Sequence, residues 1–135
     1  MKNIYEEWLH SALMDIRIIE KVLDDPFLTP VACFHAQQCI EKTLKAILEK
    51  EGREIPKTHD VIRLLGIIQE KQEIDIDIDL LQKVGELYIE SRYPGDFGLL
   101  PDGKPTLEET RIFYLFAKGI YESIKNKLDD RQGDD

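Results

Sequence analysis

Apolar residues recur at helical spacing along most of this 135-residue chain. From Tyr5 to Leu23 they follow one another three or four positions apart, which places them on one side of a helix. Five helical segments are expected in all, at residues 3–24, 30–51, 59–70, 80–91 and 112–128. Residues 73–79 alternate as a strand would, but no second such stretch exists to pair with them, so we interpret them as an acidic extended loop.

Residues that start or stop helices flank these segments. The expected N-terminal caps are Thr29 followed by Pro30, Thr58, Asp79, and the capping box formed by Thr106 and Glu109. Gly52 is the expected stop of the second helix, because glycine readily adopts the left-handed conformation that ends helices. Residues 92–105 contain three prolines and three glycines and are expected to form the longest irregular segment.

The pattern of five helical segments without a sheet predicts an all-α fold, a helical bundle. The length is that of one domain, which can bury a core without disulfides or structural metals. We therefore expect a single helical domain at residues 1–128, followed by a flexible acidic tail at residues 129–135.

Charge and composition exclude several classes of function. The 27 acidic and 18 basic residues give a net charge of −9, which disfavours binding to long DNA or to anionic membranes. No apolar run is long enough to span a bilayer and the N-terminus lacks a signal peptide, so a cytoplasmic location is expected. Cys33 and Cys39 lie on one expected helix, too far apart for a disulfide, and with no Cys-x-x-Cys pattern we expect neither a metal nor a cofactor.

Three groups of polar residues are candidates for a binding site. They are His35, Gln38 and Lys42 on the polar side of the second helix, His59 and Asp60 at the start of the third, and Tyr88, Arg92, Tyr93 and Asp96 around the end of the fourth. Arginine pairs with phosphate through two N–H donors, and aromatic side chains stack on nucleobases. Each group also has a structural interpretation: a solvated helix face, a helix start, and an arginine that caps helix carbonyls.

The order and spacing of several motifs resemble the HEPN domain family over about residues 3–128. The resemblance is carried by Trp8 and Ala12, FHAQQCIEKTLKAIL at residues 34–48, THD at 58–60, SRYPGD at 91–96 and TLEETRIFYLFAKGI at 106–120. It implies an antiparallel up-and-down bundle of four long helices plus one short helix, which usually forms a homodimer. It also implies an association with nucleotide binding and with a minimal nucleotidyltransferase encoded nearby, in some members as a toxin–antitoxin pair.

Many proteins of the HEPN family are metal-independent ribonucleases. The motif typical of these ribonucleases is an arginine followed, after four to six intervening residues, by a histidine. Here Arg92 matches the arginine, but the histidine positions hold Phe97, Gly98 and Leu99. Arg53 and His59 have the required spacing but lie before the third helix. The departure at Arg92 favours a noncatalytic protein.

We therefore predict a noncatalytic HEPN module that dimerises, binds a nucleotide or short RNA and partners a nucleotidyltransferase. The expected roles are phosphate binding by Lys42 and Arg92, base stacking by His35 and Tyr93, and selectivity from Gln38 and Asp60.

Two alternatives stay open. In the first, the protein is a ribonuclease in which His35 or His59 acts as acid or base and Arg92 or Arg53 stabilises the phosphorane. In the second, it is a pure protein interaction module, with Phe34 as the anchor of a dimer or partner surface.

Overall fold

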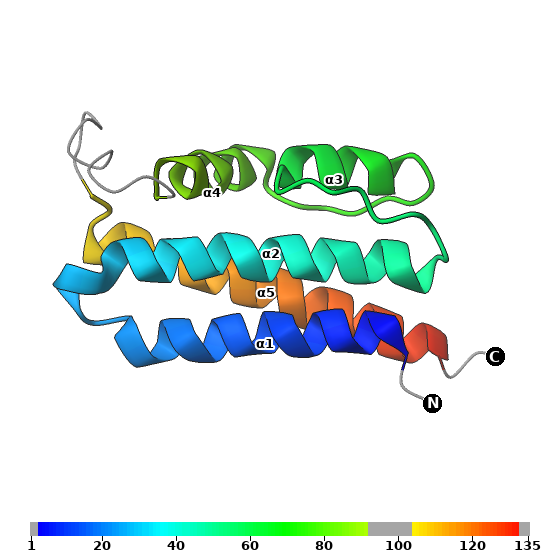
Figure 1. Cartoon of the computed structure of the whole chain (residues 1–135), viewed down its shortest axis with the longest axis horizontal. Helices are drawn as coiled ribbons and strands as arrows, with labels where there is room; N and C mark the ends of the chain where they lie inside the picture. The colour runs from blue at the N-terminus through cyan, green and yellow to red at the C-terminus, as the bar shows by residue number, and fades with distance from the viewer. Residues whose placement is uncertain (1–2, 92–103, 133–135) are drawn as a thin grey trace.

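The computed structural model describes the backbone of residues 3–91 and 104–132, and the side chains of residues 88–91 and 131–132 lie outside that description. Its helices are α1 (Ile4–Val22), α2 (Thr29–Lys50), α3 (Val61–Gln69), α4 (Ile78–Ser91) and α5 (Leu107–Gln132), with a 3-10 turn η1 (Pro26–Leu28) before α2. The described residues contain no strand, and residues 73–77 form an extended connection. Since α1 and α4 run opposite to α2 and α5 (Figure 1), the predicted all-α, up-and-down bundle is confirmed.

Helix α2 occupies the centre of the bundle. It contacts α1, α3, α4 and α5, whereas α4 and α5 make few contacts with each other in the described part of the chain. Helices α3 and α4 lie end to end in one layer on one side of α2, and α1 lies on the other (Figure 1). Fourteen of the 22 residues of α2 are buried, so α2 lacks the broad solvated side of a peripheral helix.

Three helix starts differ from the sequence prediction. Thr29 is the first residue of α2 rather than its cap, and its buried hydroxyl has no hydrogen-bond partner among the described residues. Asp60 rather than Thr58 caps α3, and Asp77 rather than Asp79 caps α4, each through its Oδ1 at 3.1 Å from backbone N–H groups of the first turn. A capping carboxylate must stand immediately before the helix to reach those N–H groups, and only Asp60 and Asp77 hold that position.

Other boundaries agree with the prediction. Gly52 has a φ of 70° and ends α2: its N–H donates to the carbonyl of Glu49 at 3.0 Å, and the N–H of Arg53 donates to Leu48 at 2.9 Å. Thr106 and Glu109 form the reciprocal capping box, with bonds of 3.0 and 3.1 Å. Helix α5 continues to Gln132, so residues 129–132, expected in the acidic tail, are helical.

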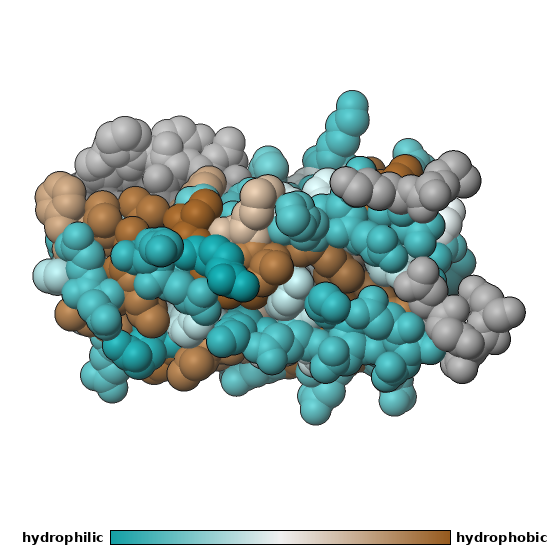
Figure 2. Space-filling view, turned by 90° about the horizontal axis from the view of Figure 1, so that it is seen from below, coloured by the Kyte–Doolittle hydropathy of each residue, from teal (hydrophilic) through white to brown (hydrophobic). Residues whose placement is uncertain are grey.

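The apolar core surrounds α2, and every helix contributes to it. Its largest fully buried side chains include Ile19 of α1, Ile40 and Leu44 of α2, Leu64 of α3 and Leu81 of α4. Some apolar surface stays outside this core: Figure 2 shows it gathered toward the end of the molecule where α1 ends and α5 begins. Exposed apolar residues of α1, η1 and α5 include Ile18, Phe27, Ile112 and Leu115.

Candidate functional site

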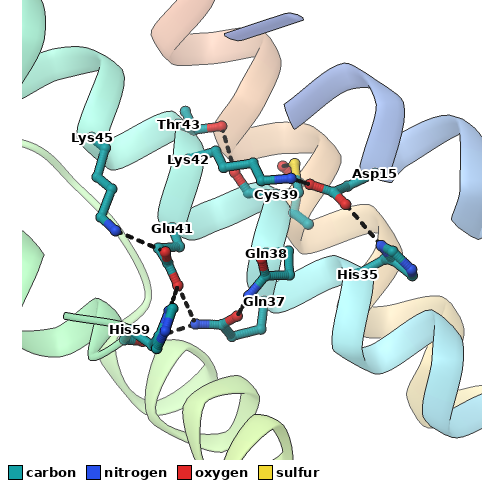
Figure 3. A network of polar contacts seen from close by, with 11 residues as sticks. Asp15, His35, Gln37, Gln38, Cys39, Glu41, Lys42, Thr43, Lys45 and His59 are labelled. Atoms are coloured by element: carbon teal, nitrogen blue, oxygen red, sulfur yellow. Dashed lines mark hydrogen bonds and ion pairs between the residues drawn. The ribbon is translucent and has the colours of Figure 1, made fainter. Parts of the chain in front are cut away.

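The polar side of α2 is enclosed by neighbouring helices rather than facing water. His35, Gln38 and Lys42 are only partly exposed, and Glu41 and Lys45 of the same helix are buried. Burying a charge is costly unless the charge is paired and hydrogen-bonded, so these side chains need partners inside the fold. They form two clusters, each built around one buried carboxylate (Figure 3).

The first carboxylate belongs to Asp15 of α1, which is 3% exposed. Its Oδ1 lies 2.7 Å from Nδ1 of His35, and its Oδ2 accepts a hydrogen bond of 2.8 Å from Nζ of Lys42. His35 and Lys42 are about two helical turns apart, so both reach Asp15 from the same side of α2. Because an ionised carboxylate only accepts hydrogen bonds, Nδ1 of His35 donates, and Nε2 is the nitrogen not bound to Asp15. We call these three residues the Asp15 cluster.

The second carboxylate belongs to Glu41 of α2, which is 4% exposed. Its Oε1 lies 3.0 Å from Nδ1 of His59 and accepts from Nε2 of Gln37 at 3.3 Å, while its Oε2 accepts from Nζ of Lys45 at 2.9 Å. The Lys45 ammonium also lies 5.6 Å from the centre of the Trp8 ring, within range of cation–π attraction. We call Gln37, Glu41, Lys45 and His59 the Glu41 cluster.

Two glutamines tie the connection between α2 and α3 to the Glu41 cluster. Nε2 of Gln37 donates to the backbone carbonyl of His59 at 2.9 Å, and Nε2 of Gln38 donates to Oε1 of Gln37 at 2.9 Å. The backbone at His59 is thereby fixed against α2, although the His59 side chain is 55% exposed. The imidazole of His59 is thus held at Nδ1 while much of its surface faces solvent.

The other described candidates have defined contacts. The Asp60 carboxylate caps α3, which is the structural interpretation of its place at a helix start. Phe34 is partly exposed and meets the His35 ring edge to face, with 5.2 Å between the ring centres and 89° between the planes. Phe34 therefore packs beside the Asp15 cluster.

Four candidates lie at least partly outside the described residues. Tyr88 belongs to α4 by its backbone, but its side chain is not described, and Arg92, Tyr93 and Asp96 lie in the segment outside the description. Their role in a site stays a prediction.

Arg53 is fully engaged in holding the end of α2 against α3. Its guanidinium lies 3.2 Å from Oε1 of Glu51 and 3.6 Å from Oε2 of Glu70, and it donates to the carbonyl of Ile67 at 3.0 Å. The side chain is 15% exposed. These contacts give Arg53 a structural role and leave little of it for binding a substrate phosphate.

The two residues around which the clusters are built, Asp15 and Glu41, are not among the candidates predicted from the sequence. For Asp15 a signal exists: it lies in the apolar stripe of α1, between Ala12 and Ile19, where a carboxylate requires an internal cation. Glu41 carries no such signal, because only the packing of α3 and its preceding loop encloses that side of α2.

Other chemistry is disfavoured in the described part of the chain. Cys33 and Cys39 are buried against α5, and burial raises the pKa of each thiol to about 12, so neither forms a reactive thiolate near neutral pH. No three or more of the described His, Cys, Asp and Glu side chains are grouped to hold a metal ion. Within residues 3–91 and 104–132, no helix has the length and apolar character needed to cross a bilayer.

Comparison with known proteins gives a consistent result. The HEPN domain family matches residues 5–127 of the chain. The crystal structure of TT1696 from Thermus thermophilus is 25% identical, with a TM-score of 0.71, and the match covers 93% of this chain and 99% of that one. The crystal structure of ST0689, described as an archaeal HEPN homologue, is 23% identical, with a TM-score of 0.65 and coverage of 95% and 99%. No curated protein matches the chain significantly.

Proposed function

The chain belongs to the HEPN domain family, and from that premise we propose that it is a noncatalytic cytoplasmic module that binds a nucleotide or short RNA. The binding surface is the partly exposed side of α2 that carries the Asp15 cluster, together with His59. In this proposal the module forms a homodimer and partners a minimal nucleotidyltransferase, as the resemblance to the family implies.

The observation that carries the proposal is the geometry of the Asp15 cluster. Asp15 bonds to both His35 and Lys42, and the side chain of each of these two residues is 22% exposed. A ring and an ammonium fixed on one side of a helix are the two groups that a nucleotide requires, one for the base and one for the phosphate. Because both are already held in place, little side-chain entropy is lost on binding.

The charge balance favours a small ligand. Lys42 is paired with Asp15 and Lys45 with Glu41, so these cations contribute little net positive potential to the surface. A long RNA needs many uncompensated cations to neutralise its phosphates and release their counterions, and the net charge of −9 opposes its binding. A mononucleotide or a few nucleotides place far less charge on the protein.

Isothermal titration calorimetry with ATP, GTP and a four-nucleotide RNA tests the proposal. Lys42→Met keeps the aliphatic stem but removes the charge. Lys42→Met and Arg92→Ala should each weaken binding about tenfold, because each variant loses one charge-assisted hydrogen bond. Lys125→Ala is the matched control, because Lys125 also pairs with an aspartate, Asp129 at 2.8 Å, but on α5. No heat with any ligand, or equal affinity of Lys42→Met and wild type, contradicts the proposal.

A ribonuclease is the second candidate, and one observation favours it. Both Asp15 and Glu41 hold Nδ1 of a histidine, an arrangement that orients the other ring nitrogen for proton transfer. Incubation of RNA with wild type, His35→Ala and His59→Ala in the presence of a chelator separates the candidates. Cleavage lost in one histidine variant would establish an enzyme, and equal absence of cleavage removes this candidate.

The interaction alternative rests on Phe34. If Phe34 anchors a dimer, Phe34→Glu should convert a dimer into a monomer when mass is measured by light scattering. An unchanged mass rejects Phe34 as the anchor but leaves the nucleotide proposal standing.

A further inference from the structure

A groove opens between α5 and residues 73–79, which we call the acidic segment. The groove has a volume of about 320 Å³; Ile74 and Ile76 form one wall, and Leu115, Phe116, Ile120 and Ile124 form the other, with the small residues Gly119 and Ser123 between them. We call it the α5 groove.

The α5 groove is apolar and continues as an exposed apolar line along α5. Leu115 is 59% exposed and Ile112, one turn earlier, is 47% exposed. From Leu115 to Ile124 the helix rises about 13 Å, the length of nine helical residues or about four extended ones. The groove is therefore long enough for several side chains of a peptide segment rather than a single ring.

Carboxylates border one edge of this groove. Glu73, Asp75, Asp77 and Asp79 are all exposed, whereas Ile74 and Ile76 between them pack against the core. None of the four forms an ion pair with any residue that the structure describes. Apart from the cap that Asp77 provides to α4, these charges interact with solvent alone in the described part of the chain.

Charge decides which occupant fits. A second copy of this acidic chain would bring further negative charge to the edge of the groove, and nucleic acid or an anionic lipid surface would do the same. A segment with apolar side chains and cations on the same face satisfies both the groove and its edge. We propose that the α5 groove docks a basic amphipathic segment of a partner protein, with its apolar side chains in the groove and its lysine or arginine side chains on the acidic segment.

Fluorescence anisotropy with a labelled 14-residue peptide of leucine and lysine in amphipathic helical order tests this. The first control peptide replaces every leucine by glycine or serine and keeps the charge, and the second replaces every lysine by glutamate. The measurements are made at about 0.15 M salt, where interactions between distant exposed charges are screened.

Two variants separate the groove from its charged edge. Gly119 lines the groove and a Cβ atom there meets no atom within 4 Å, so Gly119→Trp adds a bulky side chain at the groove, and Gly119→Ala is its control. Asp75→Asn removes one charge from the edge, and Glu7→Gln removes one exposed charge from α1 as its control. Thermal unfolding of each variant verifies that it is folded.

We expect the leucine–lysine peptide to bind wild type, about tenfold more weakly to Gly119→Trp, and a few-fold more weakly to Asp75→Asn, with both controls unchanged. Absence of binding to wild type, equal binding to Gly119→Trp, or equal binding of the glycine–serine peptide overturns the proposal. Gly119→Trp should leave nucleotide titrations unchanged, so the outcome is independent of the proposed function.

Discussion

Acidic side chains lie in two contrasting environments in this molecule. Asp15 and Glu41 are buried beside α2, and each is bonded to a lysine and a histidine of the same chain. The carboxylates of the acidic segment are exposed and form no ion pair with the described residues. The fold itself satisfies the first group, whereas the second group is left for solvent or for a partner.

The difference follows from which helices pack together. Helix α2 is covered by α1 and by the connection to α3. The buried charged side chains of α2 are therefore paired with other side chains of the chain. The space between α5 and the acidic segment is not closed in this way, so an apolar groove and unpaired charges lie side by side there, as far as the described residues extend. Internal pairing therefore holds the polar side chains of α2 in fixed positions, and missing pairing leaves the acidic segment open to a partner.

The largest effect should come from Glu41→Gln. It leaves the Lys45 ammonium, whose side chain is 9% exposed, without a charged partner, and we expect a loss of about 3 kcal/mol in the free energy of unfolding. Urea unfolding followed by the fluorescence of Trp8 measures it, since Trp8 is the one tryptophan and lies beside Lys45. The matched variant Glu73→Gln in the acidic segment should change stability by less than about 0.5 kcal/mol. Equal losses of stability in Glu41→Gln and Glu73→Gln would show that burial and pairing of a carboxylate do not determine its contribution to stability.

A smaller loss, about 2 kcal/mol, is expected for Asp15→Asn. His35 and Lys42 are each 22% exposed and can regain part of their hydration, which Lys45 cannot. The exposed pair of Asp24 and Arg111 supplies the control, because Asp24→Asn should cost less than about 0.5 kcal/mol. A larger loss in the free energy of unfolding for Asp15→Asn than for Glu41→Gln would show that exposure of the paired cations does not determine the size of the loss.

Thr29→Val should stabilise the protein by about 1 kcal/mol, because it removes a buried hydroxyl that has no partner in the described part of the chain. Thr43→Val is its counterpart: Oγ1 of Thr43 donates to the carbonyl of Cys39 at 2.8 Å, so the same change should destabilise by about 1 kcal/mol. Thermal unfolding of both variants measures the two signs. If both variants change stability in the same direction, hydrogen bonding of a buried hydroxyl on α2 does not determine its contribution to stability.

The smallest effect concerns the α5 groove. Gly119→Ala should stabilise by about 0.5 to 1 kcal/mol, because the added methyl group meets no atom and alanine is the better helix former. Gly52→Ala should instead destabilise by about 1 kcal/mol, since its φ of 70° is unfavourable for a residue with a Cβ atom. Guanidinium unfolding of both variants tests the difference. Destabilisation by Gly119→Ala would contradict an open groove at this position.

Much of the fold followed from local sequence signals. The helical stripes, Gly52 and the capping box of Thr106 and Glu109 act over a few residues, so their effects are readable from spacing alone. The caps of α3 and α4 were misplaced because Thr58 and Asp60, like Asp77 and Asp79, are competing cap residues two positions apart. Which of the two residues caps the helix depends on where the first helical turn begins. The spacing of apolar residues does not fix that position.

Periodicity and motifs along the chain are enough to predict the helices that the structure describes, their order and the HEPN family. Only the tertiary structure decided that α2 lies at the centre, that Asp15 and Glu41 hold the histidines and lysines beside it, and that the α5 groove is open. Periodicity defines which side chains share one side of a helix, but the neighbour that packs on that side comes from distant parts of the chain. Burial, and with it the pairing of Glu41, Lys42 and Lys45 on α2, is a property of that long-range packing.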